Sequence, residues 1–309
     1  MEYETLITAT SMGRNFRESY VDEVLKTNTL NGSLASSYAK EQSMVTQFAL
    51  QEQENVEQVI WELNYYSFAE DPDKVLDSAT PFPTYMYDEN KINDIRYLFN
   101  SYNVQLTQDN LEANLNGSEI RRDVEPLYKF GQVAPEETTD RIERWLGAAE
   151  PLEELPENQT KEMMIKSFKE NVVTVLEENP DTTFTFFYAP YPVYNHYRFY
   201  QIHPEYLKER LAFKEEVFEI LSEYDNAELY DFQDDREITF DIGNYMGDAV
   251  HYYEFVNEHI IDTIANEEPV TSKDEYAAKL QNLRQQILEF DIAQLDNEGI
   301  AERSITLKK

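Results

Sequence analysis

Residues 166–191, KSFKENVVTVLEENPDTTFTFFYAPY, decide the fold. The stretch begins with a helical pattern, turns at Asn-Pro-Asp, and continues into a strand of almost pure β-forming residues that ends at Pro190. A helix that leads directly into a buried apolar strand is typical of a parallel sheet, because parallel strands need a long crossover between them. The stretch therefore favours an α/β protein.

The same alternation continues on both sides of this stretch. Strand patterns occur in the run that begins at residue 5 and stops at Ser11, at 56–66 and at 227–232. Helical patterns occur at 16–26, 37–53, 205–223, 248–265 and 273–294. We therefore predict an α/β fold, a three-layer α/β/α sandwich with a mostly parallel sheet. The mostly helical pattern at about 91–169 predicts an α-helical insertion within a single domain that spans 1–309.

Composition excludes several classes of function. The chain has 309 residues, 41% of them hydrophobic, which is enough for a large core. Its net charge of -35 accompanies 13% aromatic residues, so the acidity belongs to the surface of a folded protein, and nucleic acid is not an expected partner. The absence of cysteine excludes disulfides, thiol nucleophiles and thiolate metal sites. No apolar run approaches the roughly 20 residues that cross a bilayer.

The first strand pattern delivers a serine to a turn. In TLITATSMGRNF, residues 5–16, the β-branched run stops at Ser11. In a parallel α/β sheet, catalytic groups collect at the carboxyl ends of the strands. A serine in that place is a candidate nucleophile at the N-terminus of the following helix, and it is equally well explained as a helix cap.

A serine nucleophile needs a base and a group that orients the base. Of the four histidines, only His251 has an aspartate three residues before it, Asp248, in NYMGDAVHY. At this spacing the carboxylate can accept a hydrogen bond from one ring nitrogen and leave the other to face a serine. Chain order supports a site made of Ser11, Asp248 and His251, because a parallel sheet can bring the turns after its first and last strands together.

These segments carry a family resemblance. ITATSM and NYMGDAVHY resemble the first and last blocks of the SGNH (GDSL-like) hydrolase superfamily, and the tyrosine-rich segments 80–100, 183–194 and 228–260 resemble its Gram-positive cell-surface branch, related to the D-alanyl transfer protein of the lipoteichoic acid pathway. The resemblance implies a flavodoxin-like domain, a triad of Ser11, Asp248 and His251, and ester chemistry on an acylated substrate without a cofactor.

The oxyanion-hole blocks of that family are altered here. Ala9 stands where a glycine is expected two residues before the nucleophile. The loop LNGSLASSY, residues 30–38, has Gly32 displaced and Ala35 at a glycine position, and the third block has become ELNYY, with Asn64 as its amide. We expect Gly32, Ala35 and Asn64 to form the oxyanion hole, together with the Ser11 N–H group.

The segment YAPYPVYNHYRFY, residues 188–200, follows a strand at its carboxyl end and offers a substrate surface through Tyr188, Tyr191 and Tyr194. The alternative is that most of these rings pack the core. The acidic run DFQDDRE, residues 231–237, is more typical of a solvated face than of a metal site, so no metal is expected.

Two functions stay open at this point. The first is a serine esterase or acyltransferase that acts on an acylated cell-envelope polymer or a small ester. The second is a non-catalytic cell-surface binding or assembly protein that keeps the fold. The resemblance further implies a location on the extracellular face of the membrane, with a parent N-terminal anchor that this chain lacks.

Overall fold

The computed structural model describes residues 2–53, 55–77, 81–88, 90–116, 139–248 and 250–296. Its centre is a parallel sheet of five strands in the order β2-β1-β3-β4-β5, which are Thr29–Asn31, Thr5–Thr8, Gln58–Leu63, Thr183–Tyr188 and Ala227–Asp231. The chain moves from β1 to one edge and then crosses back, so the direction of winding reverses between β1 and β3. Ligands bind in open α/β sheets at the carboxyl ends of the strands beside such a point.

Alternate residues of the strands enter two separate cores. Trp61 and Phe186 face one side of the sheet, whereas Ile60 and Phe187 face the other, and all four are fully buried. This period of two is the geometry of an extended strand. Because both faces are buried, the strands are continuously apolar, which is the pattern that the sequence shows.

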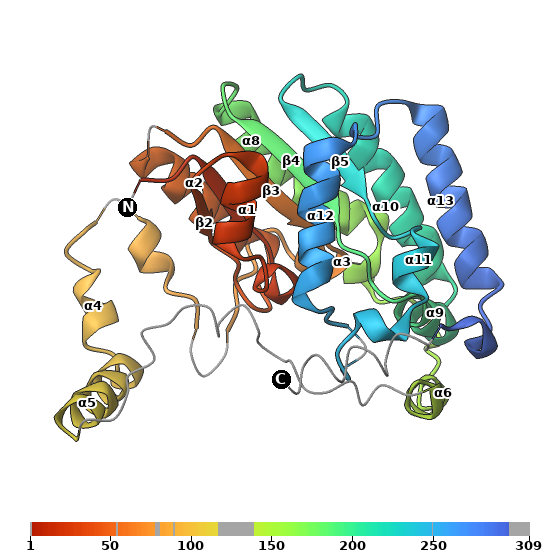
Figure 1. Ribbon diagram of the computed structural model, residues 1–309, viewed down its shortest axis with the longest axis horizontal. Coiled ribbons are helices and arrows are strands. Elements are labelled where there is room, and N and C mark those ends of the chain that lie inside the picture. The colour runs from red at the N-terminus through yellow and green to blue at the C-terminus, as the bar shows by residue number, and fades with distance from the viewer. Residues whose placement is uncertain are drawn as a thin grey trace.

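Helices cover both faces of the sheet (Figure 1). α1 (Glu18–Leu25) and α12 (Glu254–Asn266) pack together on one face. The other face carries α2 (Ala39–Glu52), α3 (Tyr65–Phe68), α7 (Lys161–Phe168), the π-helical turn Lys169–Val173, α8 (Thr174–Glu178), α10 (Glu205–Leu221) and α13 (Lys273–Leu288). The predicted three-layer α/β/α sandwich is confirmed.

The segment predicted as a helical insertion contains several helices in its described part, joined by non-helical stretches such as 148–156. It contains α4 (Ile95–Leu98), α5 (Ser101–Leu115) and α6 (Thr139–Gly147), and it ends with α7, which packs against α10 in the outer layer. Residues 117–138 lie outside the described residues, so the boundaries of an insertion stay a prediction. α4 and α5 extend away from the sheet as an arm (Figure 1).

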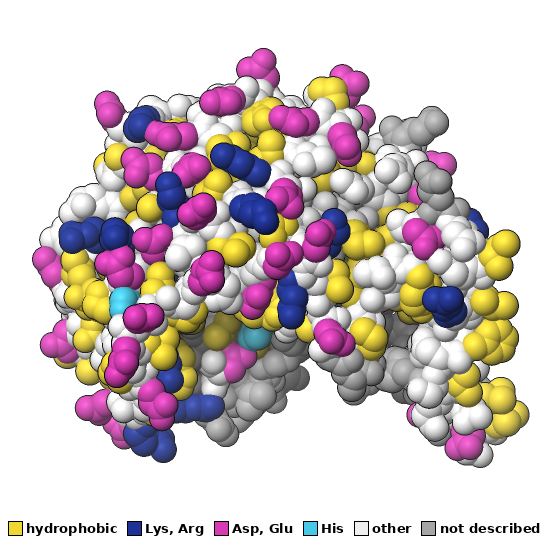
Figure 2. Space-filling view, turned by 180° about the vertical axis from the view of Figure 1, so that it is seen from behind, with side chains coloured by type: hydrophobic (Ala, Val, Ile, Leu, Met, Phe, Trp, Pro, Cys, Tyr) yellow, Lys and Arg dark blue, Asp and Glu magenta, His cyan; other side chains and the backbone are white. Residues whose placement is uncertain are grey.

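The surface of the sandwich and the surface of the arm differ in character. Figure 2 shows acidic side chains spread over the body among lysines and arginines, whereas hydrophobic side chains gather on the arm. The exposed apolar residues of the arm and of the turn before it are Ile92, Ile95, Tyr97, Leu98, Phe99, Val104, Leu106, Leu111 and Leu115. Among the described helices, none is long and apolar enough to cross a membrane.

Two elements differ from the sequence prediction. The edge strand β2 was not predicted, because it has only three residues and gives no measurable period. No element was predicted for the tyrosine-rich segment after β4, whereas in the structure α9 (Val193–Ile202) begins directly after Pro192. Proline is well tolerated before the first turn of a helix. The aromatic residues of this segment gave no clear helical pattern, so the sequence did not predict α9.

Candidate active site

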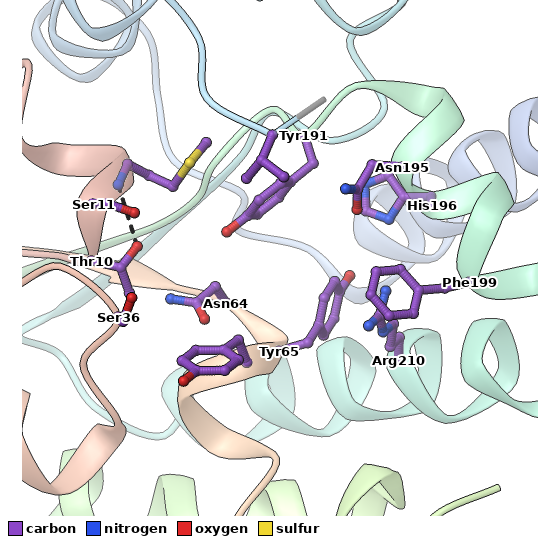
Figure 3. A pocket seen from close by; sticks show the side chains of 13 residues that line it. Thr10, Ser11, Ser36, Asn64, Tyr65, Tyr191, Asn195, His196, Phe199 and Arg210 are labelled. Carbon is purple, nitrogen blue, oxygen red and sulfur yellow. Dashed lines mark hydrogen bonds between the residues drawn. The ribbon is translucent and has the colours of Figure 1, made fainter. Parts of the chain in front are cut away.

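A cavity of about 290 Å³ lies at the carboxyl ends of the strands. Its lining comes from the turns that follow β1 and β3, from the loop after β2, and from α9 and α10. The lining residues are Thr10, Ser11, Met12, Ser36, Asn64, Tyr65, Tyr66, Tyr191, Asn195, His196, Phe199, Arg210 and Val250 (Figure 3). The cavity therefore occupies the place where this sheet topology is expected to bind a ligand.

The turn after β1 holds Ser11 in the cavity. Ser11 begins a single 3-10 turn, Ser11–Gly13, and is not at the N-terminus of α1 as the sequence suggested, because α1 begins only at Glu18. The cap of this turn is Thr10, whose hydroxyl accepts from the Met12 N–H group. A Cβ atom at Gly13 would lie 2.4 Å from the Cβ of Ala9, so the turn requires glycine at this position.

Ser11, His251 and Asp248 form a hydrogen-bonded chain. Ser11 Oγ lies 2.7 Å from His251 Nε2, and His251 Nδ1 lies 2.5 Å from Asp248 Oδ2. An ionised carboxylate can only accept, so Asp248 fixes the ring proton on Nδ1 and leaves Nε2 to accept from the serine hydroxyl. This is the arrangement in which a histidine can remove the proton of a serine.

Asp248 is itself held in place by the backbone. Its Oδ1 accepts from the N–H groups of Val250 and His251, at 3.1 and 2.9 Å. Partial burial acts to raise the pKa of Asp248, but the hydrogen bonds from the side chain and backbone of His251 and from Val250 outweigh it and lower the pKa below its ordinary value. Asp248 is therefore a stable anion beside the imidazole. The loop that carries both residues precedes α12, which begins at Glu254.

A buried carboxyl group of β3, Glu62, supports the serine turn from below. Glu62 Oε2 accepts from both the N–H and the hydroxyl group of Thr10, each at 2.8 Å, and the Tyr191 hydroxyl lies 3.5 Å from Oε1. Burial raises the pKa of Glu62, and these hydrogen bonds and the nearby His251 partly offset that rise. Glu62 is thus a positioning residue for the turn that carries Ser11.

Asn64 presents a hydrogen-bond donor to the same cavity. Its Oδ1 accepts from the Ser67 N–H group at 2.9 Å and caps α3, which fixes the orientation of the amide. The remaining Nδ2 group is buried and has no partner among the described residues. Figure 3 shows the Asn64 side chain on the side of the cavity where Thr10, Ser11 and Ser36 lie. An unpaired, preorganised donor there can stabilise an oxyanion on a carbonyl attacked by Ser11.

The structure does not place the other two predicted oxyanion residues, Gly32 and Ala35, at the cavity, so their predicted role is corrected. The Gly32 N–H group donates to the carbonyl of Ile7 at 2.9 Å, which extends the pairing of the edge strand beyond β2, and Gly32 does not line the cavity. Ala35 does not line it either, whereas its neighbour Ser36 does. Ser36 has a φ of 59°, the left-handed conformation that favours glycine, so a non-glycine residue at this position carries backbone strain.

The tyrosines predicted to bind substrate divide into two groups. Tyr191 lines the cavity. Tyr188 and Tyr194 are completely buried in separate hydrophobic cores and do not contact the cavity, so their predicted role is wrong. Tyr188 points into the same core as Phe184 and Phe186, because alternate residues of β4 share one face of the sheet. Tyr194 lies on the inner side of α9 and packs edge to face on Trp145.

The inner end of the cavity contains polar residues that the sequence analysis missed. Figure 3 shows Asn195, His196 and Phe199 of α9, and Arg210 of α10, on the opposite side of Tyr191 from Ser11. Arg210 lies in the helical pattern YLKERLAFKEEVF, where a charged residue is normally assigned to the solvated face. No single-residue signal distinguishes it from the exposed charges of that helix.

Comparisons with known proteins gave no match, either to a family model, to a curated protein or to a solved structure. Within the part of the chain that the structure describes, no group of three or more histidine, aspartate or glutamate side chains could hold a metal ion. The function is therefore argued from the geometry of the cavity.

Proposed function

We propose that this protein is a serine-dependent ester hydrolase or acyltransferase in which Ser11 is the nucleophile, His251 the general base and Asp248 the group that orients the base. The observation that carries the proposal is the pair of short hydrogen bonds that link Ser11 Oγ to His251 Nε2 and His251 Nδ1 to Asp248. A serine that is only a turn cap does not need an oriented imidazole on its hydroxyl.

The first half of the reaction follows from this geometry. His251 Nε2 takes the hydroxyl proton as Ser11 Oγ bonds to the ester carbonyl carbon, and the carbonyl oxygen becomes an oxyanion beside Asn64 Nδ2. Asp248 stabilises the imidazolium that forms. The imidazolium then gives its proton to the leaving alkoxide as the C–O bond breaks, which leaves an acyl group on Ser11.

In the second half, a water molecule or an acceptor hydroxyl loses its proton to His251 and attacks the acyl carbon. The proton returns to Ser11 Oγ as the acyl group leaves. Water gives hydrolysis and an alcohol gives transfer, so both reactions use the same residues.

The finer assignment rests on the sequence resemblance alone. Similarity of the first and last blocks to the cell-surface SGNH branch supports an acylated cell-envelope polymer or a small ester as substrate, and a location on the extracellular face of the membrane. We keep both as part of the proposal.

Hydrolysis of p-nitrophenyl acetate tests the proposal. We expect steady turnover by the unmodified chain and a loss of at least about 1000-fold in the variants Ser11→Ala and His251→Ala, as for other triads. Ser222→Ala is the matched control, because the exposed Ser222 hydroxyl donates to the carbonyl of Glu219 at the end of α10 and does not line the cavity; it should retain turnover. Absence of turnover in the unmodified chain, or turnover that survives both triad variants, would overturn the proposal in favour of a binding role.

A further inference from the structure

Arg210 brings a positive charge into the inner end of the cavity. Only 8% of the residue is exposed, and its guanidinium lies against the faces of Phe199, Tyr65 and Tyr206, with its central carbon 3.8, 4.6 and 5.3 Å from the ring centroids. These contacts hold the charged group in one position. They stabilise the cation only in part, because aromatic rings do not replace the hydrogen bonds of water.

The Nε atom of Arg210 is buried and has no hydrogen-bond partner among the residues that the structure describes. Burial lowers the pKa of Arg210 to about 10, and the groups that act against this effect are the phenols of Tyr65, Tyr206 and Tyr191, not a carboxylate. An arginine carries five donors in a planar fork that matches the oxygens of a carboxylate or a phosphate. A buried charge of this kind is normally paired.

His196 adds a second polar group without a partner at the same end. Its Nε2 is buried and unpaired among the described residues. Burial, followed by the positive charges of Arg210 and Lys214, holds the pKa of His196 well below its ordinary range, so the ring is neutral. The ring packs edge to face on Tyr65 and Tyr191 and lines the cavity. Arg210 and His196 therefore both have a nitrogen without a hydrogen-bond partner among the described residues, and both line the inner end of the cavity.

We infer that the ester bound at Ser11 carries an anionic oxygen group, a carboxylate or a phosphate, on its acyl part, and that this group pairs with Arg210 at the inner end of the cavity. The inference rests on the proposed function, which supplies the bound ester. It adds the class of substrate and the residue that selects it.

The acyl part is the one that reaches Arg210, because the leaving alcohol must stay beside His251, which protonates it. The side chains of His251 and Asp248 are 21% and 49% exposed, so that side of the site opens to solvent. The acyl part is thus directed toward the enclosed end. An acyl group with an ammonium, such as a D-alanyl ester, is disfavoured there by charge repulsion.

The test compares three p-nitrophenyl esters: the hemisuccinate, which is anionic, the butyrate, which is neutral, and the 4-(trimethylammonio)butyrate, which is cationic and cannot cyclise, each corrected for its rate of hydrolysis without protein. For the unmodified chain we expect kcat/KM for the hemisuccinate to exceed that for the butyrate by about 10-fold to 100-fold, the effect of one hydrogen bond between charged groups, with the 4-(trimethylammonio)butyrate slowest. In Arg210→Gln the ratio of hemisuccinate to butyrate should fall to about one, and Arg210→Lys should retain only part of the preference, because lysine keeps the charge but not the planar fork.

Arg236→Gln is the matched control, because Arg236 also stacks on an aromatic ring, Phe240, at 3.7 Å, but does not line the cavity. It should leave the ratio unchanged. Turnover of the butyrate without a preference for the hemisuccinate would overturn the inference and leave the proposed function standing.

A binding measurement decides the inference even if the chain has no esterase activity. Ligand-observed NMR on the Ser11→Ala variant would compare monomethyl succinate, methyl 3-phosphonopropanoate and methyl butyrate. We expect at least one of the two anions to bind more tightly than methyl butyrate, and the tighter anion identifies a carboxylate or a phosphate as the preferred group. Equal binding of all three ligands, or an anion preference that survives Arg210→Gln, would overturn the inference.

Discussion

The two ends of the cavity differ in how their polar groups are satisfied. At the outer end, Ser11, His251 and Asp248 are joined in a continuous chain of hydrogen bonds, and Glu62 holds the turn beneath them. At the inner end, Arg210 and His196 have polar atoms that are buried without a partner in the described structure. A buried polar group without a partner costs free energy, and this is the physical basis of our inference that a ligand group pairs with Arg210. At the outer end the corresponding unpaired donor is Asn64 Nδ2, which we assign to the oxyanion.

One helix contains both situations. Arg210 and Lys214 lie one turn apart on α10, and both are buried. Lys214 Nζ lies 2.6 Å from Asp231 Oδ2 at the end of β5 and 2.9 Å from Gln233 Oε1. Lys214 thus forms a buried ion pair with Asp231. Arg210 instead lines the cavity. The difference separates a charge that stabilises the fold from a charge that is available for a ligand.

The largest expected effect is on the free energy of unfolding, and it compares the paired lysine with the arginine of the cavity. Lys214→Met leaves Asp231 buried without its cation, so we expect it to lower the free energy of unfolding by about 3–5 kcal/mol. Arg210→Met removes a charge without leaving a carboxylate unpaired, and we expect a change below about 1 kcal/mol. Urea denaturation of the two variants measures the contrast. Similar losses in both would mean that Arg210 is also a structural group.

A smaller effect concerns the oxyanion donor at the outer end. Asn64→Ser keeps an oxygen that can cap α3 but removes the amide donor, so we expect kcat to fall by about 100-fold to 1000-fold while the fold is retained. Asn100→Ala is the control, since Asn100 caps α5 by accepting from Asn103, far from the cavity, and it should leave kcat unchanged. Full activity in Asn64→Ser would show that backbone groups alone bind the oxyanion.

The smallest effect is a pH dependence of stability at the inner end. Burial depresses the pKa of His196, so below the unfolded value of about 6.5 the unfolded chain binds a proton that the folded chain does not. Protonation of His196 in the unfolded chain therefore lowers the free energy of unfolding as the pH falls below about 6.5, by at most about 1.4 kcal/mol per pH unit. Urea denaturation at pH 7.5 and pH 5.5 should show a shallower loss in His196→Gln than in the unmodified chain. Parallel losses would mean that His196 takes up its proton in the folded protein.

The sequence predicted the features that depend on pattern and chain order. Alternation of helices and apolar strands was sufficient for the sandwich, since both faces of a parallel sheet are buried. Ser11, Asp248 and His251 could be chosen because the turns after the first and last strands of such a sheet meet, whereas Asn64 was chosen from the family resemblance of ELNYY.

The remainder depends on contacts that no local pattern contains. Gly32 is excluded from the oxyanion hole by a single backbone hydrogen bond to Ile7. Tyr188 and Tyr194 differ from Tyr191 only in the side toward which the backbone turns them. Arg210 resembles a surface residue in sequence, and it is enclosed by the packing of α9 against α10 and by Tyr65 of α3.

The most direct test of the account is to identify the residue that reacts with a fluorophosphonate. The unmodified chain is treated with diisopropyl fluorophosphate, digested, and examined by tandem mass spectrometry. The account predicts one adduct, on Ser11, which disappears in His251→Ala because the hydroxyl is then no longer activated. No adduct, or an adduct on another hydroxyl such as that of Ser36, would contradict the assignment of Ser11 as the nucleophile.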